Sequence, residues 1–245
     1  MKFDPPLEAG ILLRRYKRFL ADIQFPDGSE TTAHCPNPGA MLGVAPEGAR
    51  CWVSRSSSKT RKLPLTLEVV ECPSPGSKDC LVGINTHRPN KLAEEAIALG
   101  LVDGIDSEKP LEREVRYGEE RSRIDLLQRG GEGDQGPSGD LFIEVKNCHL
   151  LRRDDGVSEF PDCVTARGLK HLRELVRVID EGGRAMLLFI VQRSDAVSVT
   201  TAQDLDPKYA EGFRWAAEQG VAMRAVRCTV TQGDITPDLA LPVIV

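Results

Sequence analysis

The chain has 245 residues, of which 40% are hydrophobic and 28% are charged. This composition is typical of a globular protein and argues against a chain that is disordered throughout. The length suits one large domain or two small ones. No window approaches about 18 consecutive apolar residues, which argues against a membrane-spanning helix.

The charge of the chain is −5 overall but is unevenly distributed. Residues 1–85 hold 11 basic and 9 acidic residues, whereas residues 86–245 hold 21 and 28. This asymmetry indicates two modules with a boundary near residue 85. The N-terminal segment, MKFDPPLEAG, lacks the apolar core of a signal peptide, so a cytoplasmic protein is expected. The seven scattered cysteines include no CxxC pair, which predicts buried, reduced thiols.

The first module has the pattern of a small β-barrel. Strands are expected over residues 18–25, 49–54, 65–71 and 80–84. The sequence Pro26-Asp27-Gly28 is typical of a turn. Several short strands at close spacing predict a small closed or half-closed barrel.

The second module alternates helices with strands. Helices are expected over residues 91–100, 164–180 and 207–219, and strands over 111–117, 122–127, 140–147, 185–192 and 221–229. Asn90 is expected to cap the first helix. The glycine-rich stretch 130–139 is expected at the tip of a hairpin. This order predicts an α/β domain with a central mixed sheet flanked by helices.

Two acidic residues on neighbouring strands carry the clearest chemical signal. Residues i and i+2 of a strand share a face, so Glu144 and Lys146 are expected to project together. If the two strands pair as a hairpin, Asp125 approaches Glu144. Two adjacent carboxylates repel unless a proton or a cation neutralises them. Oxygen ligands of this kind favour Mg²⁺ or Mn²⁺.

A divalent cation beside a lysine provides the catalytic groups of a hydrolytic nuclease. The cation polarises a phosphoryl oxygen and activates a water molecule. Lys146 would position that water or stabilise the charge that develops on the phosphate. Glu95, on the preceding helix, is a candidate third ligand of the cation, with Glu94 as the neighbour to exclude. The alternative is that Glu144 and Lys146 form an ordinary salt bridge on a strand.

Basic residues interleaved with aromatic ones indicate contacts with nucleic acid, because cations bind phosphates and rings stack on bases. The candidates are Arg15, Tyr16, Lys17, Arg18, Arg55, Lys59, Arg61 and Lys62 in the first module, and Arg167, Lys170 and His171 on the second predicted helix. Two alternatives stay open. The first cluster also suits an edge strand protected from aggregation, and the helical residues suit a solvated face.

These segments together resemble the sugar fermentation stimulation protein A family, and the resemblance extends over nearly the whole chain. Its marks are the segments 15–22, 34–37, 122–125, 144–147, 160–162, 167–175 and 189–193. The resemblance implies an N-terminal OB-fold, a C-terminal domain like the PD-(D/E)xK nucleases, non-specific DNA binding and a regulatory link to maltose metabolism.

Within this resemblance the nuclease pattern falls on Asp125, Glu144 and Lys146, with Glu95 as the helix acid. The chain departs from the pattern in its glycine-rich insertion and at Leu169, where nuclease-like proteins often carry a polar residue.

Three functions remain open from the sequence. The first is a DNA-binding protein, with single-stranded DNA among its candidate ligands, that cleaves DNA with Mg²⁺ or Mn²⁺. The second is a DNA-binding regulator of sugar metabolism that keeps the nuclease scaffold without cleaving. The third is a nuclease directed at RNA, because OB-folds bind either nucleic acid. A homodimer is a candidate assembly in each case.

Overall fold

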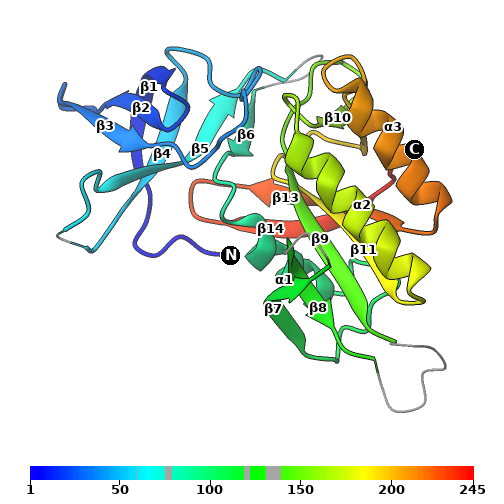
Figure 1. Ribbon diagram of the computed structural model, residues 1–245. Helices are drawn as coiled ribbons and strands as arrows, with labels where there is room; N and C mark the ends of the chain where they lie inside the picture. Colours follow the sequence, from blue (N-terminus) through cyan, green and yellow to red (C-terminus); the bar gives the residue numbers. More distant parts are fainter. Residues whose placement is uncertain (59, 75–78, 119–121, 131–138) are drawn as a thin grey trace.

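A closed β-barrel occupies the first third of the chain (Figure 1). The computed structural model describes residues 1–58, 60–74, 79–118, 122–130 and 139–245. The barrel strands are β1 (Glu8–Tyr16), β2 (Leu20–Gln24), β3 (Glu30–His34), β4 (Arg50–Arg55), β5 (Leu65–Cys72) and β6 (Cys80–Gly83). They form one sheet in the order β3-β2-β1-β4-β5-β6, and a further pairing of β3 with β5 closes it. The predicted OB-like barrel is therefore confirmed.

The strand predicted over 18–25 begins later and is preceded by another strand. Lys17 and Arg18 both have positive φ and form the turn between β1 and β2. Residues with a Cβ rarely adopt this conformation, so the sequence offered no signal for a turn here. β1 and β3 were missed because the basic run of β1 and the polar ETTAH of β3 hide the alternation of buried side chains.

A mixed sheet forms the centre of the second region. Its strands are β7 (Leu111–Tyr117), β8 (Ser122–Gln128), β9 (Leu141–Cys148), β11 (Arg184–Val191), β13 (Ala222–Val230) and β14 (Ile235–Leu241). Their order is β14-β13-β11-β9-β8-β7. β9, β11 and β13 run parallel, whereas the outer pairings are antiparallel. Two short strands, β10 (Val157–Phe160) and β12 (Ser198–Thr201), pair separately in parallel.

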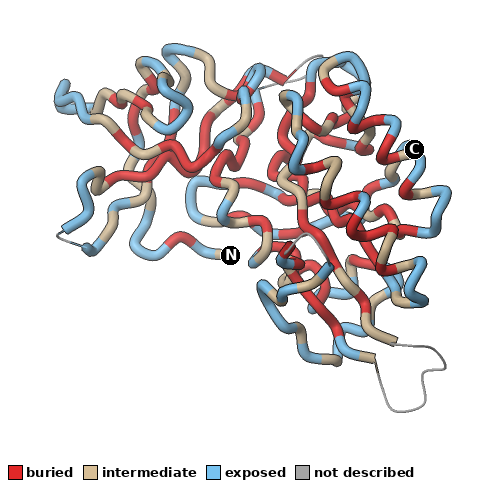
Figure 2. Tube along the Cα trace, in the orientation of Figure 1, coloured by how far each residue is buried: buried red, intermediate tan, exposed pale blue. Residues whose placement is uncertain are grey.

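Helices cover both faces of this sheet, as predicted. α1 (Pro89–Ala98) packs on one face, and α2 (Ala166–Asp180) and α3 (Pro207–Glu218) pack on the other. Figure 2 shows the buried strands between these layers. α2 begins after Thr165, whose hydroxyl accepts a hydrogen bond from the Gly168 amide at 3.0 Å. The predicted cap at Asn90 is wrong: Pro89 occupies the start of α1, which moves the cap to Arg88.

The residues between β8 and β9 were predicted to form a hairpin tip. The two strands are antiparallel neighbours, and Gln128 is paired with Leu141. Residues 131–138 themselves lie outside the described residues. In the part of the chain that is described, no helix is both long and apolar enough to cross a membrane.

Contacts of three kinds hold the barrel against the mixed sheet. Trp52 and Val69 of the barrel share an apolar cluster with α1 and with the sheet. The Phe3 amide donates to the carbonyl of Gly233, so the N-terminal segment pairs with the turn between β13 and β14. The Met41 amide donates to Asp162 at 2.7 Å. These contacts fix the barrel against the second region, whose strands β8 and β9 carry the predicted acidic residues Asp125 and Glu144.

Candidate metal and nucleic-acid site

A cleft of about 860 Å³ lies between the barrel and the mixed sheet. We refer to it as the acidic cleft. Its sheet side includes Asp125 from β8 and Glu144 and Lys146 from β9. Its barrel side includes Phe19 and His34. The segment before α1 and the first turns of α2 complete its walls. The structure therefore brings the three predicted nuclease residues into one cavity.

Asp125 lies where the pairing of β8 with β9 ends. The last paired residues are Leu126 and Ile143. At the next position the Asp125 carboxylate replaces a ladder bond, because it accepts the amide of Val145 at 2.8 Å. Its other oxygen accepts the side-chain amide of Asn90 at 3.0 Å. Burial, together with the nearby charge of Glu144, raises the pKa of Asp125 from 3.8 to about 6.

Glu144 is the most buried acid of the cleft, with 3% of its surface exposed. Its Oε1 accepts the Lys146 ammonium at 2.5 Å and also contacts Nδ1 of His171. Burial disfavours the charged carboxylate, but the ammonium and the imidazole outweigh that effect, so the pKa of Glu144 is lowered. Its Oε2 is buried and has no hydrogen-bond partner. Because the described residues offer this buried oxygen no partner, a cation or a water molecule bound there would lower the cost of burying it.

His171 connects the acidic pair to the basic face of α2. Its Nε2 accepts a hydrogen bond from Nε of Arg167 at 3.3 Å. Because arginine only donates, this bond places a ring proton on Nδ1, where it faces Glu144. Lys146 Nζ lies 3.1 Å from the same Nδ1. His171, predicted to contact phosphate, is therefore a direct partner of Glu144.

The donor set of the cleft fits a hard divalent cation. The available ligands are carboxylate oxygens, which Mg²⁺ and Mn²⁺ prefer to nitrogen or sulfur. Among the described residues no group of three His, Cys, Asp or Glu side chains is arranged to hold a metal. Mg²⁺ sites often need only one or two carboxylates, since water and substrate phosphates supply the remaining ligands. The unpartnered Oε2 of Glu144 is the group that such a cation would satisfy.

Glu95 does not join this cluster, and the prediction that it would bind the cation is wrong. Its carboxylate accepts the N-terminal ammonium of Met1 at 2.7 Å, and it is not among the residues that line the acidic cleft. Glu94 is paired with Arg113. The helix residue that does reach the site is Asn90, one turn earlier, whose amide holds Asp125. Asn is common at helix caps, so the sequence pattern predicted a cap at Asn90 and gave no sign that its amide would bind Asp125.

The predicted cations of the barrel separate into two groups, and the first of them is structural. The Arg15 guanidinium donates to the backbone carbonyls of Arg18, Asn37, Gly39 and Ala40. It thereby ties the β1–β2 turn to the following loop. The Tyr16 hydroxyl donates to Asp22, and the ring is covered by Arg14. Arg55 forms a two-pronged ion pair with Glu8.

The second group, which includes the predicted cations of α2, faces a cavity. Arg18 and Arg167 line the acidic cleft. Lys170 lines an adjoining cavity of about 330 Å³ together with Glu114 and Arg123. Arg61 lies 3.4 Å from the ring of His34. Lys17 and Lys62 are exposed and line none of these cavities, and Lys59 lies outside the described residues.

Sequence reasoning missed a polar chain at the far end of the cleft. Gln192 donates to Asn147 at 2.7 Å, and the Asn147 amide lies 2.9 Å from Nδ1 of His149. His149 Nε2 in turn lies 3.4 Å from Asp162, which holds the barrel through Met41. These residues come from four separate segments, so no spacing in the sequence could have grouped them.

Two family models match the chain. One describes the SfsA N-terminal OB domain and covers residues 13–84, and the other describes the Sugar fermentation stimulation protein RE domain and covers residues 87–234. A sugar fermentation stimulation protein homolog from Methylobacterium radiotolerans is 49% identical over 245 residues, which is 100% of this chain and 99% of the relative. A homolog from Shewanella baltica is 47% identical and covers 96% of each chain.

A solved structure is similar over the same extent. The structure of Pyrococcus furiosus SfsA in complex with Ca²⁺ has a TM-score of 0.84 and 27% sequence identity to this chain. The superposition covers 100% of this chain and 98% of that one. The arrangement of barrel and mixed sheet is therefore shared by both proteins.

Proposed function

The chain belongs to the sugar fermentation stimulation protein family, and on the geometry of its acidic cleft we propose that it binds DNA without sequence preference and hydrolyses phosphodiester bonds. The proposed cofactor is Mg²⁺ or Mn²⁺, held by Asp125 and Glu144. The observation that carries the proposal is the buried, unpartnered Oε2 of Glu144, next to a carboxyl group whose pKa is raised to about 6. The Ca²⁺ of the related Pyrococcus structure is another cation that prefers oxygen ligands.

Each residue of the cleft has a role that follows from its position. When bound, the cation would polarise the scissile phosphate and lower the pKa of a water molecule. Glu144 and Asp125 would present their oxygens to it, and the amides of Asn90 and Val145 hold Asp125 in place. Lys146 would donate to the phosphate oxygen or the attacking water, since its ammonium lies at Glu144 on the cleft wall. Arg167 would bind a neighbouring phosphate.

The alternative function is a DNA-binding regulator that keeps the scaffold without cleaving. The geometry favours the enzyme, because a binding protein gains nothing from a buried pair of carboxylates facing a phosphate. Without a cation, Asp125 and Glu144 would repel the DNA backbone that the surrounding cations attract. With a divalent cation bound to Asp125 and Glu144, the same site would attract the DNA backbone.

The test is a cleavage assay on purified protein. Single-stranded and duplex DNA, and an RNA of the same sequence, are incubated with Mg²⁺, with Mn²⁺ or with a chelator. We expect cleavage of DNA with either cation and none with the chelator. Glu144→Gln keeps the size of the side chain but removes its charge, so it should reduce cleavage by about 10³-fold or more while DNA binding stays within about twofold.

The result separates the candidate functions. Cleavage of RNA in preference to DNA would support the RNA-directed nuclease. Salt-sensitive DNA binding without cleavage under any of these conditions would contradict the proposed enzyme and support the regulator.

A further inference from the structure

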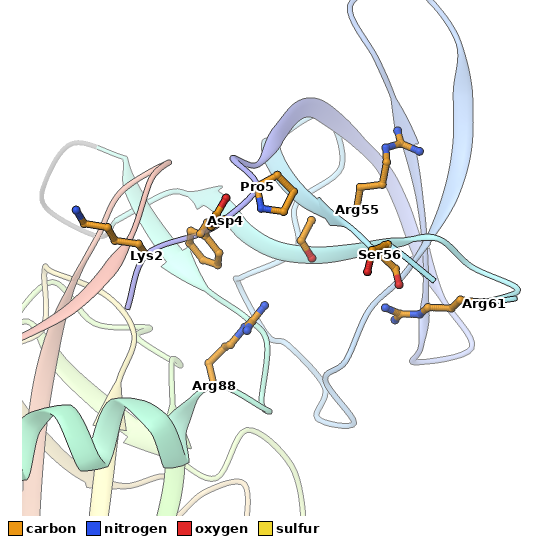
Figure 3. Close-up of a pocket in the computed structure, with 10 residues that line it drawn as sticks. Lys2, Asp4, Pro5, Arg55, Ser56, Arg61 and Arg88 are labelled. Atoms are coloured by element: carbon orange, nitrogen blue, oxygen red, sulfur yellow. The ribbon is translucent and has the colours of Figure 1, made fainter. Parts of the chain in front are cut away.

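A second cavity of about 490 Å³ lies beside the acidic cleft, between the N-terminal segment, the β4–β5 loop and the start of α1 (Figure 3). We refer to it as the basic pocket. Its charged residues are Lys2, Asp4, Arg55, Arg61 and Arg88, and the hydroxyls of residues 54 and 56–57 complete it. Four cations and one carboxylate thus line the pocket.

The cations of the basic pocket differ in how far they are neutralised. Arg55 is paired with Glu8, and Arg88 is paired with Glu68 at 2.6 Å. Figure 3 shows Arg61 and Arg88 facing the same opening from two sides. Among the described residues no ion pair holds Lys2 or Arg61. Figure 3 shows the Lys2 side chain directed away from Arg61 and Arg88, so an anion in this pocket would bind chiefly to Arg61.

The basic pocket and the acidic cleft share a rim. Arg61 lines the basic pocket and lies 3.4 Å from His34, which lines the cleft. The segment before α1 contributes to both, because Arg88 faces the pocket while His87 and Pro89 face the cleft. A chain of phosphates that leaves the cleft past His34 would reach Arg61 directly.

An aromatic platform stands on the same route. The Phe19 ring lies almost parallel to the ring of His34, at an interplanar angle of 18° and a centroid distance of 6.5 Å. Phe19 is 46% exposed, although large apolar side chains are usually buried. It sits on the β1–β2 turn, where the carbonyl of Arg18 accepts a hydrogen bond from Arg15. A base that stacks on Phe19 would extend the Phe19–His34 stack.

We propose that the Phe19–His34 platform and Arg61 form a binding track for single-stranded nucleic acid, which leads from the acidic cleft into the basic pocket. One unpaired base stacks on Phe19, and the next phosphate binds Arg61. A duplex keeps its bases stacked on each other, so it cannot use the platform. The inference rests on the proposed function, since it defines the strand that would reach the carboxylates.

The experiment measures binding with a chelator present, so that it does not depend on cleavage. Fluorescence anisotropy compares a labelled single-stranded oligonucleotide with the same sequence as a duplex. Phe19→Leu removes the ring from an exposed position and should weaken single-strand binding about tenfold, with duplex binding within about twofold of the unmodified protein. Phe19→Trp restores a ring and should restore single-strand affinity.

Arg61 has a matched control in the next residue, Lys62, which is also exposed but does not line the basic pocket. Arg61→Ala should weaken single-strand binding about threefold or more and reduce the slope of log affinity against log salt by about 1. Lys62→Ala should change affinity less than about twofold.

Several outcomes would overturn the track. These are unchanged single-strand binding in Phe19→Leu, equal losses for single strand and duplex, or equal losses in the Arg61 and Lys62 variants. Each of these binding results is compatible with cleavage of DNA, and binding results that support the track are compatible with a protein that does not cleave DNA. The binding result and the cleavage result are therefore separate tests.

Discussion

The two sides of the acidic cleft use charge in opposite ways. On the sheet side, Glu144, Lys146 and His171 are largely buried and bound to one another, so their positions are fixed by mutual contacts. On the barrel side, Arg18 and Phe19 are exposed and line the cleft, and within the described part of the chain no ion pair holds Arg18. Fixed, desolvated charges suit a chemical step, whereas exposed cations and rings suit attraction of a polyanion. We therefore expect substitutions on the sheet side to change the cleavage rate and substitutions on the barrel side to change the affinity for nucleic acid.

Lys146→Met should produce the largest effect on the proposed chemistry. The substitution keeps an unbranched chain but removes the ammonium that lies 2.5 Å from Glu144. We expect cleavage to fall by about 10²–10³-fold, because one electrostatic donor is lost, while DNA affinity changes little. The measurement is the single-turnover cleavage rate at saturating protein. Lys208→Met, on the exposed start of α3, is the control and should leave the rate unchanged. Equal losses in both variants would contradict a local role for Lys146.

Arg15→Ala should produce the largest effect on stability among the barrel cations. Its guanidinium donates to four backbone carbonyls, including bonds of 2.8 Å to Gly39 and 2.9 Å to Asn37. We expect the free energy of unfolding to fall by about 2–3 kcal/mol, measured by chemical denaturation. Arg14→Ala removes a cation whose side chain is 63% exposed, and should cost no more than about 1 kcal/mol. Equal values for the two variants would show that the Arg15 bonds do not stabilise the turn.

Asp125→Asn should stabilise the protein near neutral pH when no divalent cation is present. The folded-state pKa of Asp125 is about 6, above its ordinary value of 3.8, so the folded protein binds this proton more tightly than the unfolded chain. The stabilising contribution is complete below about pH 4 and is lost as the pH rises through 6. The ionised carboxylate therefore costs stability at pH 7. At pH 7 the free energy of unfolding of the variant should be about 1–2 kcal/mol higher, because the charge is removed. The loss of one of the two hydrogen bonds that the carboxylate accepts limits this gain.

Two comparisons check the origin of that gain. It should disappear near pH 4, where Asp125 is protonated in the folded protein, and Mg²⁺ should stabilise the unmodified protein more than the variant. Thermal unfolding at both pH values, with and without Mg²⁺, measures both effects. A gain that is independent of pH and of Mg²⁺ would contradict the assignment of the raised pKa and of the cation to this carboxyl group.

Glu95→Gln should produce the smallest effect. The carboxylate contacts the N-terminal ammonium instead of the cleft, so cleavage should stay within about twofold of the unmodified protein. The unfolding free energy should fall by no more than about 1 kcal/mol. A loss of cleavage as large as that of the Lys146 variant would place Glu95 in the site after all.

The sequence was sufficient where local patterns determine structure. The period-2 alternation around Glu144 predicted that it shares a face with Lys146, and both side chains do line one cavity. The apolar run over residues 185–192 predicted a strand, and β11 lies there between two parallel neighbours. Both properties depend on a few adjacent residues and on the geometry of a single strand.

The sequence was insufficient where distant segments meet. Arg15 reads as a free cation in a basic run, but carbonyls from residues 37–40 bind it. Asn90 reads as a helix cap, but it holds a carboxylate 35 positions away. Glu95 is the only member of the predicted nuclease set that was inferred from a helix instead of a strand, and it is the one that the structure places elsewhere. The orientation of a helix about its own axis depends on packing that short-range patterns do not encode.

The hydrogen bonds that Arg15 donates around the β1–β2 turn have a kinetic consequence. Because Arg15 binds the Arg18 carbonyl of this turn and three carbonyls of the loop around Gly39, the turn is held to that loop before a ligand arrives. The backbone that carries Phe19 is thus positioned before any encounter. Association with an oligonucleotide should then be limited by collision and by ionic strength, with no slower rearrangement phase in a stopped-flow trace.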